Sequence, residues 1–118
     1  MSIAFISHHD CALHDMGAHH PESPARLSAI QDQLLSSGLE FAMRNYEAPL
    51  ATVEQLYRVH DKDYVDDIFQ RAPKDYGQIW LDPDTSMMAD SLNAALRAAG
   101  AVTLGVDLVM SSDEQAAF

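Results

Sequence analysis

The chemically reactive side chains of this chain gather in one stretch, from His8 to Leu27. This stretch holds five histidines, the single cysteine of the chain and three acidic residues. Imidazole, thiolate and carboxylate are the groups that bind metals and move protons near neutral pH. The stretch has no helix or strand periodicity, and irregular segments carry functional residues disproportionately often. We therefore expect a functional site here.

A zinc site is the first interpretation of this stretch. Such a site needs three or four donors that converge tetrahedrally, commonly at a recognisable spacing. The histidines and Cys11 match no established zinc-finger or zincin spacing. Adjacent side chains of an extended segment point to opposite sides, so we expect His8 and His9 not to bind one ion together. We favour side chains that line a surface or cleft and predict no metal ligands in the chain, with a metal site as the alternative.

Cys11 as a nucleophile is a second interpretation, because histidines are close in sequence. A neighbouring carboxylate such as Asp10 raises the pKa of a thiol rather than lowering it. This favours a buried or rim cysteine, and the reactivity of Cys11 stays open. A lone cysteine forms no disulfide within the chain, which favours a cytoplasmic protein.

Two further charged positions have competing interpretations. Arg26 follows Glu22 and two prolines at the start of an expected helix, where a surface ion pair is the simplest explanation. Asp82 and Asp84 flank Pro83 in a loop that precedes another helix. They are placed either to cap that helix or to direct a carboxylate at a ligand, and we favour capping.

The charge balance limits the classes of partner. Seven basic and eighteen acidic residues give a net charge of −11 over 118 residues. This disfavours nucleic acid, because phosphate binding depends on clustered Lys and Arg. It is compatible with a cationic substrate. The most apolar region contains Asp90, Arg97 and Asp107, so we expect no membrane span, and the N-terminus lacks the pattern of a signal peptide.

The expected elements alternate between strand and helix, which predicts an α/β protein with parallel strands and flanking helices. The clearest signals are a buried strand, a helix that begins after two prolines and ends at a glycine, and a capped helix after Asp61. The expected strands cover 3–6 and 41–46. The expected helices cover 24–37, a short turn after Thr52, a stretch after Asp61, and 88–110. Residues 82–86 and 111–118 are expected as loops, and Leu27, Ile30, Leu34 and Leu35 as the buried face of the first long helix.

Three motifs in collinear order resemble the start of the histone deacetylase family, in its bacterial deacetylase and acetylpolyamine amidohydrolase branches. The first is the histidine-rich loop with HPESPAR, His20 to Arg26. The second is VHDKDYVDDI, Val59 to Ile68, and the third is DPDTS with the following Ala-rich helix. Because the resemblance spans the whole chain, we expect the N-terminal portion of an arginase/deacetylase-like fold over residues 1–118, without an internal domain boundary.

The resemblance implies hydrolysis of N-acetyl groups from lysine or polyamines by zinc-bound water. Arg26 resembles an arginine of the internal channel near the acetate pocket, and Asp84 resembles a rim aspartate that holds substrate amides. His14 and His20 resemble residues of the first rim loop. These four are the expected substrate-binding or channel residues, and no catalytic residue is expected among them.

The chain departs from the family pattern at its end. Relatives continue from a segment like QAAF into Arg-Pro-Pro-Gly-His-His, and the later zinc ligands and catalytic tyrosine are also not matched. We therefore expect a truncated deacetylase that is inactive by itself, with no cofactor of its own and zinc implied only for the full-length family. The alternative is a non-catalytic interaction module that forms a homo-oligomer or pairs with a partner.

Overall fold

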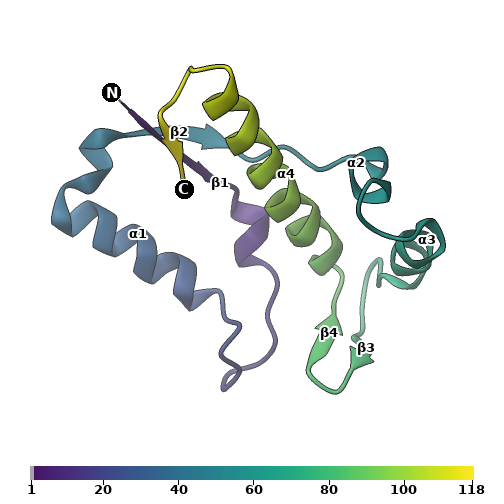
Figure 1. Ribbon diagram of the computed structural model, residues 1–118. Coiled ribbons are helices and arrows are strands. Elements are labelled where there is room, and N and C mark those ends of the chain that lie inside the picture. Colours follow the sequence, from purple (N-terminus) through teal and green to yellow (C-terminus); the bar gives the residue numbers. More distant parts are fainter. Residues whose placement is uncertain (1) are drawn as a thin grey trace.

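A computed structural model describes residues 2–118 and shows two small sheets with helices around them (Figure 1). The chain order is β1 (Ile3–Ser7), η1 (His9–Ala12), α1 (Ala25–Ser37), η2 (Leu39–Ala42), β2 (Met43–Glu47), α2 (Val53–Tyr57), α3 (Lys62–Arg71), β3 (Ile79–Asp82), β4 (Thr85–Met87), α4 (Ser91–Met110) and β5 (Ala116–Ala117). The elements η1 and η2 are single 3-10 turns. This arrangement confirms the α/β class.

The larger sheet is parallel and has the strand order β2-β1-β5. The apolar β1 is central, with Ala4 fully buried. Its register with β2 runs from Ile3 opposite Met43 to Ser7 opposite Glu47. Phe118 attaches the last strand, because its N–H donates to Ala4 at 2.8 Å and its carbonyl accepts from Ile6 at 2.9 Å. The smaller sheet is the antiparallel hairpin β3–β4.

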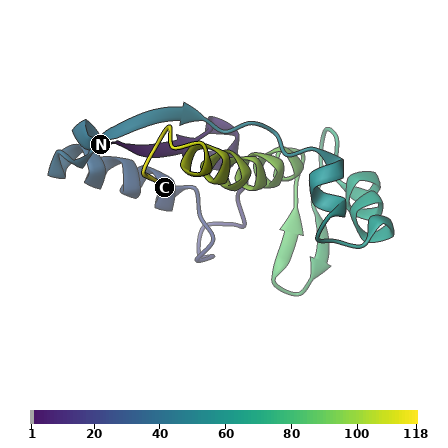
Figure 2. The ribbon, with the colours of Figure 1, turned by 45° about the horizontal axis from the view of Figure 1, so that its top comes forward.

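The long helix α4 packs along β1, β5 and η1 (Figure 2). A Cβ atom at Gly100 would lie 1.8 Å from the carbonyl oxygen of Pro49, so this close approach requires a glycine. Ala51 donates its N–H to the carbonyl of Leu96 at 2.9 Å, and Arg97 donates to the carbonyl of Ala48 at 2.9 Å. The N-terminal half of α4 is therefore fixed to the segment that follows β2.

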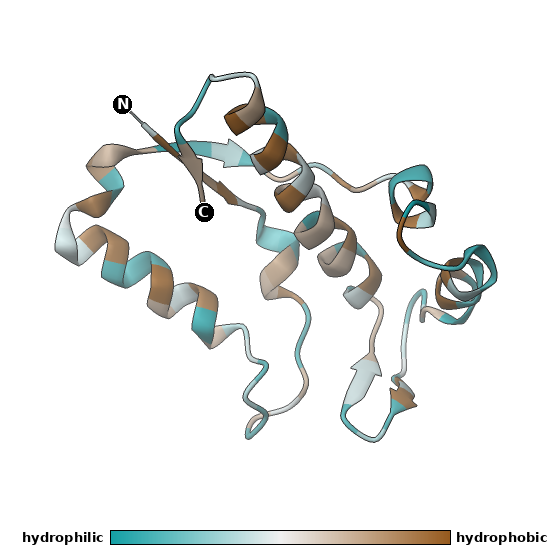
Figure 3. Cartoon of the chain, viewed as in Figure 1, coloured by the Kyte–Doolittle hydropathy of each residue, from teal (hydrophilic) through white to brown (hydrophobic). Residues whose placement is uncertain are grey.

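By length and composition alone, α4 is also long and apolar enough to cross a membrane. Mostly buried core helices pass the same test, whereas 17% of the apolar window of α4 is buried within the described residues. Here α4 lies against the sheet, and its Arg97 forms an ion pair with Asp10 at 3.0 Å. Figure 3 shows the apolar residues of α4 concentrated toward its C-terminal half, close to β1 and β5.

The local helix signals are confirmed. Gly38 ends α1 in the left-handed conformation, with φ of 74°. Thr52 and Gln55 form a reciprocal capping box at the start of α2. Asp61 caps α3 by accepting the backbone N–H groups of Asp63 and Tyr64. Pro24 directly precedes α1, and the Ser23 hydroxyl accepts the N–H of Ala25 at 3.2 Å.

Three expectations about tertiary structure are wrong. The apolar face of α1 is not buried among the described residues, and Leu35 is 60% exposed, because α1 packs mainly against η2. Residues 82–86 are not simply a loop, because they turn the β3–β4 hairpin. Residues 111–118 include β5, whose two residues pair with β1. In each case the deciding contact is with a residue distant in sequence or with another element.

Candidate functional site

A cavity of about 520 Å³ lies where the histidine-rich stretch meets the hairpin, α3 and the first half of α4. We call it the loop cavity. Its polar or ionisable lining residues are Cys11, His14, Glu22, Ser23, Arg26, Tyr64, Thr85, Ser86 and Ser91. Segments separated by up to 87 residues of chain, from Cys11 to Ala98, thus converge on one space. Two of the four expected site residues, His14 and Arg26, line it directly.

His14 is held at the cavity wall by the first residue of α4. Its Nδ1 lies 2.7 Å from the Ser91 hydroxyl, and that oxygen also accepts the N–H of Met88 at 2.9 Å. Ser91 is buried. A buried hydroxyl that serves both a backbone group and an imidazole fixes the ring position. Sequence reasoning missed Ser91, since a serine at a helix start ordinarily signals only capping.

Arg26 forms the expected ion pair, with its Nη2 at 2.6 Å from Glu22 Oε1. Both side chains are about half exposed, and both line the loop cavity. An exposed pair of this kind contributes about 0–1 kcal/mol to stability. The guanidinium is therefore free to exchange Glu22 for an anionic ligand at little energetic cost, and the surface-pair and channel interpretations are compatible.

His20 and Asp84 meet outside the cavity lining, with Nε2 and Oδ1 2.9 Å apart. The Nδ1 atom of His20 accepts the N–H of Glu22, so the neutral ring carries its proton on Nε2 and donates it to Asp84. The Asp84 side chain is 87% exposed. This bond joins the histidine-rich stretch to the hairpin turn across 64 residues of sequence.

The expectation that Asp82 or Asp84 caps the following helix is wrong. Asp82 instead accepts the backbone N–H of Asp84 at 2.8 Å within the hairpin turn. The hydrogen bonds from the Asp84 backbone and then from Thr85 hold the pKa of the Asp82 carboxyl below its usual value. Asp90 precedes α4 without a side-chain cap. Neither carboxylate is available to cap α4, because both are used at the hairpin turn. Asp82 accepts a backbone N–H within the turn, and Asp84 bonds to His20.

Cys11 lines the loop cavity and is partly buried. Burial, followed by the charge of Asp10, raises the pKa of its thiol. The sulfur lies 3.9 Å from the carbonyl of Ala94. A thiol with a raised pKa is a weak nucleophile at neutral pH. The structure agrees with the interpretation of Cys11 as a partly buried, protonated residue of the wall.

The expectation that His8 and His9 point apart is wrong. The chain leaves β1 and turns at once into η1, so the two imidazoles stack with centroids 4.5 Å apart. Asp10 lies beside both rings and is bonded by Arg97. Burial raises the pKa of the Asp10 carboxyl, but the Arg97 hydrogen bond and the nearby positive charges outweigh it, so that pKa lies below its usual value.

The loop cavity does not fit a catalytic zinc ion on its own. Zinc needs three or more donors whose atoms lie close together, whereas His14 is bonded to Ser91 and Glu22 to Arg26. Within residues 2–118, the group of three possible metal donors within 4.8 Å of one another is His8, His9 and Asp10, and none of these lines the cavity. We derive no reaction step through zinc in this chain.

Fold and site together define one wall of a cavity with polar lining in an α/β protein, and comparison with known proteins gives its family. The family profile described as "Histone deacetylase domain" matches residues 20–118. The chain therefore belongs to the histone deacetylase family.

Two relatives show how much of such a protein is present. Histone deacetylase B of Dictyostelium discoideum is 29% identical over 80 residues, which are 68% of this chain and 19% of that protein. A crystal structure of the HDA15 HD domain has a TM-score of 0.85 and 25% identity. The match covers 99% of this chain and 34% of that one. The chain thus spans about a fifth to a third of the lengths of these relatives.

Proposed function

We propose that this chain supplies the N-terminal wall of a zinc-dependent deacetylase site that hydrolyses acetyl-lysine or acetylpolyamines. The observation that carries the proposal is the convergence of His14 and Arg26 on one cavity in a chain of this family. In this role, Arg26 binds the carboxylate of the acetate product. His14 and the His20–Asp84 pair form the rim, where the exposed Asp84 accepts hydrogen bonds from substrate amides.

The charge of the chain supports the same substrate class. Deacetylation of lysine or a polyamine produces a cationic amine, and the net charge of −11 favours cations near the protein. A cytoplasmic setting belongs to the same proposal, because Cys11 is a free cysteine.

We further propose that the chain is truncated relative to an active deacetylase and inactive by itself. Hydrolysis of an amide requires a metal ion or comparable group to activate water, and a base to position it. The loop cavity offers no converging set of such donors within residues 2–118. The zinc ligands of the active protein then lie outside this chain.

The shape of the molecule supports the need for more polypeptide. Its radius of gyration is 15.8 Å, whereas a compact domain of this length has about 13.5 Å. The core consists mainly of small residues, with Leu96, Met87 and Val65 as its largest apolar members. A well-covered domain buries more large side chains than this.

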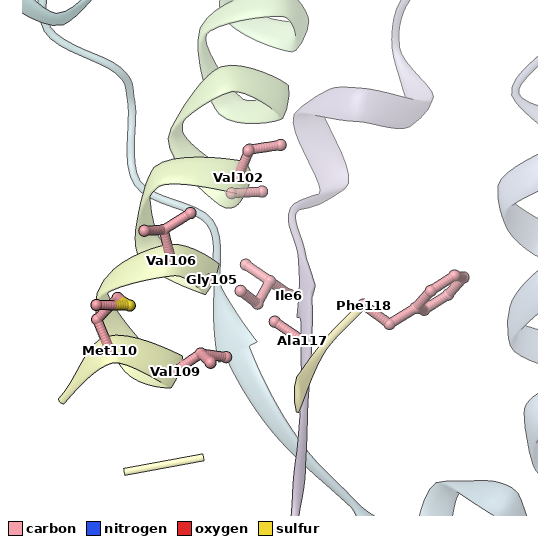
Figure 4. Close-up of a pocket in the computed structure, with 9 residues that line it drawn as sticks. Ile6, Val102, Gly105, Val106, Val109, Met110, Ala117 and Phe118 are labelled. Carbon is pink, nitrogen blue, oxygen red and sulfur yellow. The ribbon is translucent and has the colours of Figure 1, made fainter. Parts of the chain in front are cut away.

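An apolar hollow of about 460 Å³ lies between β1, β5 and the C-terminal half of α4 (Figure 4). We call its lining the apolar face, which consists of Ile6, Ala101, Val102, Gly105, Val106, Val109, Met110, Ala117 and Phe118. Val102 is 69% exposed and Met110 is 78% exposed. An exposed apolar patch beside an open strand edge is typical of a protein interface. This supports covering by further deacetylase polypeptide.

The same face favours a second candidate function, that of a non-catalytic module that self-associates. A second copy that covers the apolar face would also hide the free edge of β5. Sedimentation equilibrium at micromolar concentration separates the two candidates. A dimer that dissociates in the variant Val106→Asp supports the module, whereas a stable monomer contradicts it. The variant Val59→Asp, at an exposed position away from this face, is the control.

Ligand binding tests the deacetylase proposal. We expect N-acetyl-lysine amide and acetate to shift NMR signals of loop-cavity residues, weakly but specifically, and Arg26→Ala to remove the acetate response. Arg71→Ala is the matched control, because Arg71 forms a similar helical ion pair with Asp67 at 3.2 Å. Equal losses in both variants would contradict the assignment of Arg26. Turnover of acetyl-lysine by the 118-residue chain with added Zn²⁺ would overturn the expectation of inactivity.

A further inference from the structure

His8, His9 and Asp10 occupy the carboxyl end of β1, outside the loop cavity. Glu47 lies next to them, because it ends β2 directly opposite Ser7 in the parallel register. Two strand ends thus bring two imidazoles and two carboxylates together. The His8 side chain is only 5% exposed, whereas those of His9 and Glu47 are 78% and 79% exposed. The inner side of the cluster, at His8, is therefore buried, and its outer side, at His9 and Glu47, is open to solvent.

The distances between donor atoms in this cluster match those between ligands of one metal ion as well as those of ion pairs. His9 Nε2 lies 3.2 Å from Asp10 Oδ1, and His8 Nε2 lies 3.4 Å from Glu47 Oε1. Donors about 2.0–2.2 Å from a tetrahedral zinc ion are roughly 3.3–3.5 Å apart. A good N–H···O hydrogen bond is shorter, at about 2.9–3.0 Å. The donor atoms of His8, His9 and Asp10 all lie within 4.8 Å of one another.

Arg97 orients the Asp10 carboxylate by bonding only one of its two oxygens. The guanidinium Nε donates to Oδ2 at 3.0 Å, which leaves Oδ1 directed at His9. Carboxylates that bind metals are commonly held by such outer hydrogen bonds. The positive charge of Arg97 also weakens cation binding. Its effect is opposed by Glu47, whose carboxylate supplies a second negative charge at the site.

His8 sets an upper limit on the affinity. Its Nδ1 accepts the N–H of Asp10 at 3.0 Å, so the neutral ring carries its proton on Nε2. A metal at His8 must displace that proton or the backbone hydrogen bond. We therefore expect micromolar rather than nanomolar affinity.

We propose that His8, His9 and Asp10 form a binding site for a divalent transition-metal ion of the zinc type, with the Glu47 carboxylate beside His8 as an additional negative charge. Imidazole and carboxylate together suit zinc, cobalt and nickel ions. Such an ion would fix the turn that directly follows β1 and stabilise the fold against unfolding. The proposal is independent of deacetylase activity, since none of its residues lines the loop cavity.

The test uses the 118-residue chain with Co²⁺ and Zn²⁺ alone. We expect one equivalent of Co²⁺ to give visible absorption bands that Zn²⁺ abolishes, and Zn²⁺ to raise the midpoint of thermal unfolding. His9→Ala should weaken Zn²⁺ binding at least tenfold in a competition assay with a coloured chelator. Its exposure means that this substitution leaves the fold intact, which circular dichroism checks. Glu47→Gln should weaken binding by a smaller factor.

The control is His19→Ala, an exposed histidine elsewhere in the same stretch. The proposal is overturned if the chain binds no Co²⁺ below millimolar concentration, or if His19→Ala weakens binding as much as His9→Ala. It is equally overturned if His9→Ala binds the metal as well as the unaltered chain does. Loss in His9→Ala with retention in His19→Ala supports it, whatever the outcome of acetyl-lysine assays.

Discussion

The two main hollows of this molecule are similar in size and opposite in chemistry. The loop cavity measures about 520 Å³ and carries His14, Arg26 and Cys11 on its wall. The hollow at the apolar face measures about 460 Å³, and its lining contains no charged side chain among the described residues. Both share α4, which contributes its first half to one and its second half to the other. Volume alone therefore does not identify a functional site, whereas the convergence of polar groups does.

The contrast extends to how each region is held together. Around the loop cavity, side-chain hydrogen bonds join distant segments: His14 bonds Ser91 at the wall, and His20 bonds Asp84 outside the lining. The apolar face depends on β5, which is anchored through the buried Glu114. Substitutions that remove the contacts of one region at a time show whether the loop cavity and the apolar face are stabilised independently.

The largest effect is expected at Gly100, which lies between the two regions. In Gly100→Ala, the new Cβ would lie 1.8 Å from the Pro49 carbonyl oxygen and 2.7 Å from its carbon, both backbone atoms that cannot rotate away. We expect a loss of more than about 3 kcal/mol in the free energy of unfolding, measured by urea denaturation.

Gly105→Ala is the comparison within the same helix. Its Cβ would lie 3.1 Å from the Ala117 Cβ and 3.4 Å from the Ile6 Cδ1, so shifts of a few tenths of an ångström relieve both contacts. We expect a loss of about 1 kcal/mol or less. Equal losses at both glycines would contradict the view that α4 is fixed mainly at its first half.

The second prediction concerns Glu114 and the apolar face. Hydrogen bonds from Ser2 and Tyr46 outweigh burial and hold the pKa of this carboxyl below its ordinary value of 4.5. A carboxyl with a lowered pKa stabilises the fold above pH 4.5, and this contribution is lost as the pH falls through the lowered value. Acid should therefore release β5 first.

Hydrogen exchange at Phe118 measures that release, because its N–H is bonded to Ala4. We expect Glu114→Gln to lower the protection of this amide, relative to its intrinsic exchange rate, at neutral pH and to remove the acid dependence of that protection, while the loop cavity is unchanged. Glu54→Gln, at an exposed position in α2, is the control. Retention of the acid dependence in Glu114→Gln would show that another group anchors β5.

The third prediction concerns the loop cavity. Ser91→Ala removes the partner of His14 Nδ1 and the acceptor for the Met88 N–H. We expect a loss of about 1–2 kcal/mol, because two hydrogen bonds are removed and a backbone group is left unpaired. Increased motion of the His14 ring in NMR relaxation should accompany it. Ser36→Ala, which removes an exposed hydroxyl from α1, should change neither property.

The smallest effect is expected for Arg26→Ala. Loss of its exposed pair with Glu22 should change the free energy of unfolding by less than about 0.5 kcal/mol, similar to Arg71→Ala. A large loss in Arg26→Ala alone would show that Arg26 is a packing residue of the loop cavity rather than a ligand-binding one.

Much of the fold follows from local sequence signals. The capping box at Thr52, the cap at Asp61 and the stop at Gly38 are all present, because each is made by residues within four positions of one another. The position of α4 was predicted to within three residues at its start. The strand β5 was not, because two alanines carry no strand signal of their own and pair only through β1.

The candidate site was predicted in composition but not in geometry. His14, His20, Arg26 and Asp84 were singled out from the sequence, yet their partners were not. Ser91 lies 77 residues from His14, and Asp84 lies 64 residues from His20. No periodicity or spacing rule connects positions so far apart, since their contact depends on how the hairpin and α4 pack.

The sequence by itself determined the family and the α/β class, because motifs, caps and apolar runs are properties of neighbouring residues. Only the tertiary structure decided which side chains meet. The parallel register of β1 with β2 places Glu47 beside His8, and the 3-10 turn at η1 stacks His8 on His9. A turn of the backbone immediately after a strand ends the alternation by which consecutive side chains point to opposite sides, and here α4 packs against that turn.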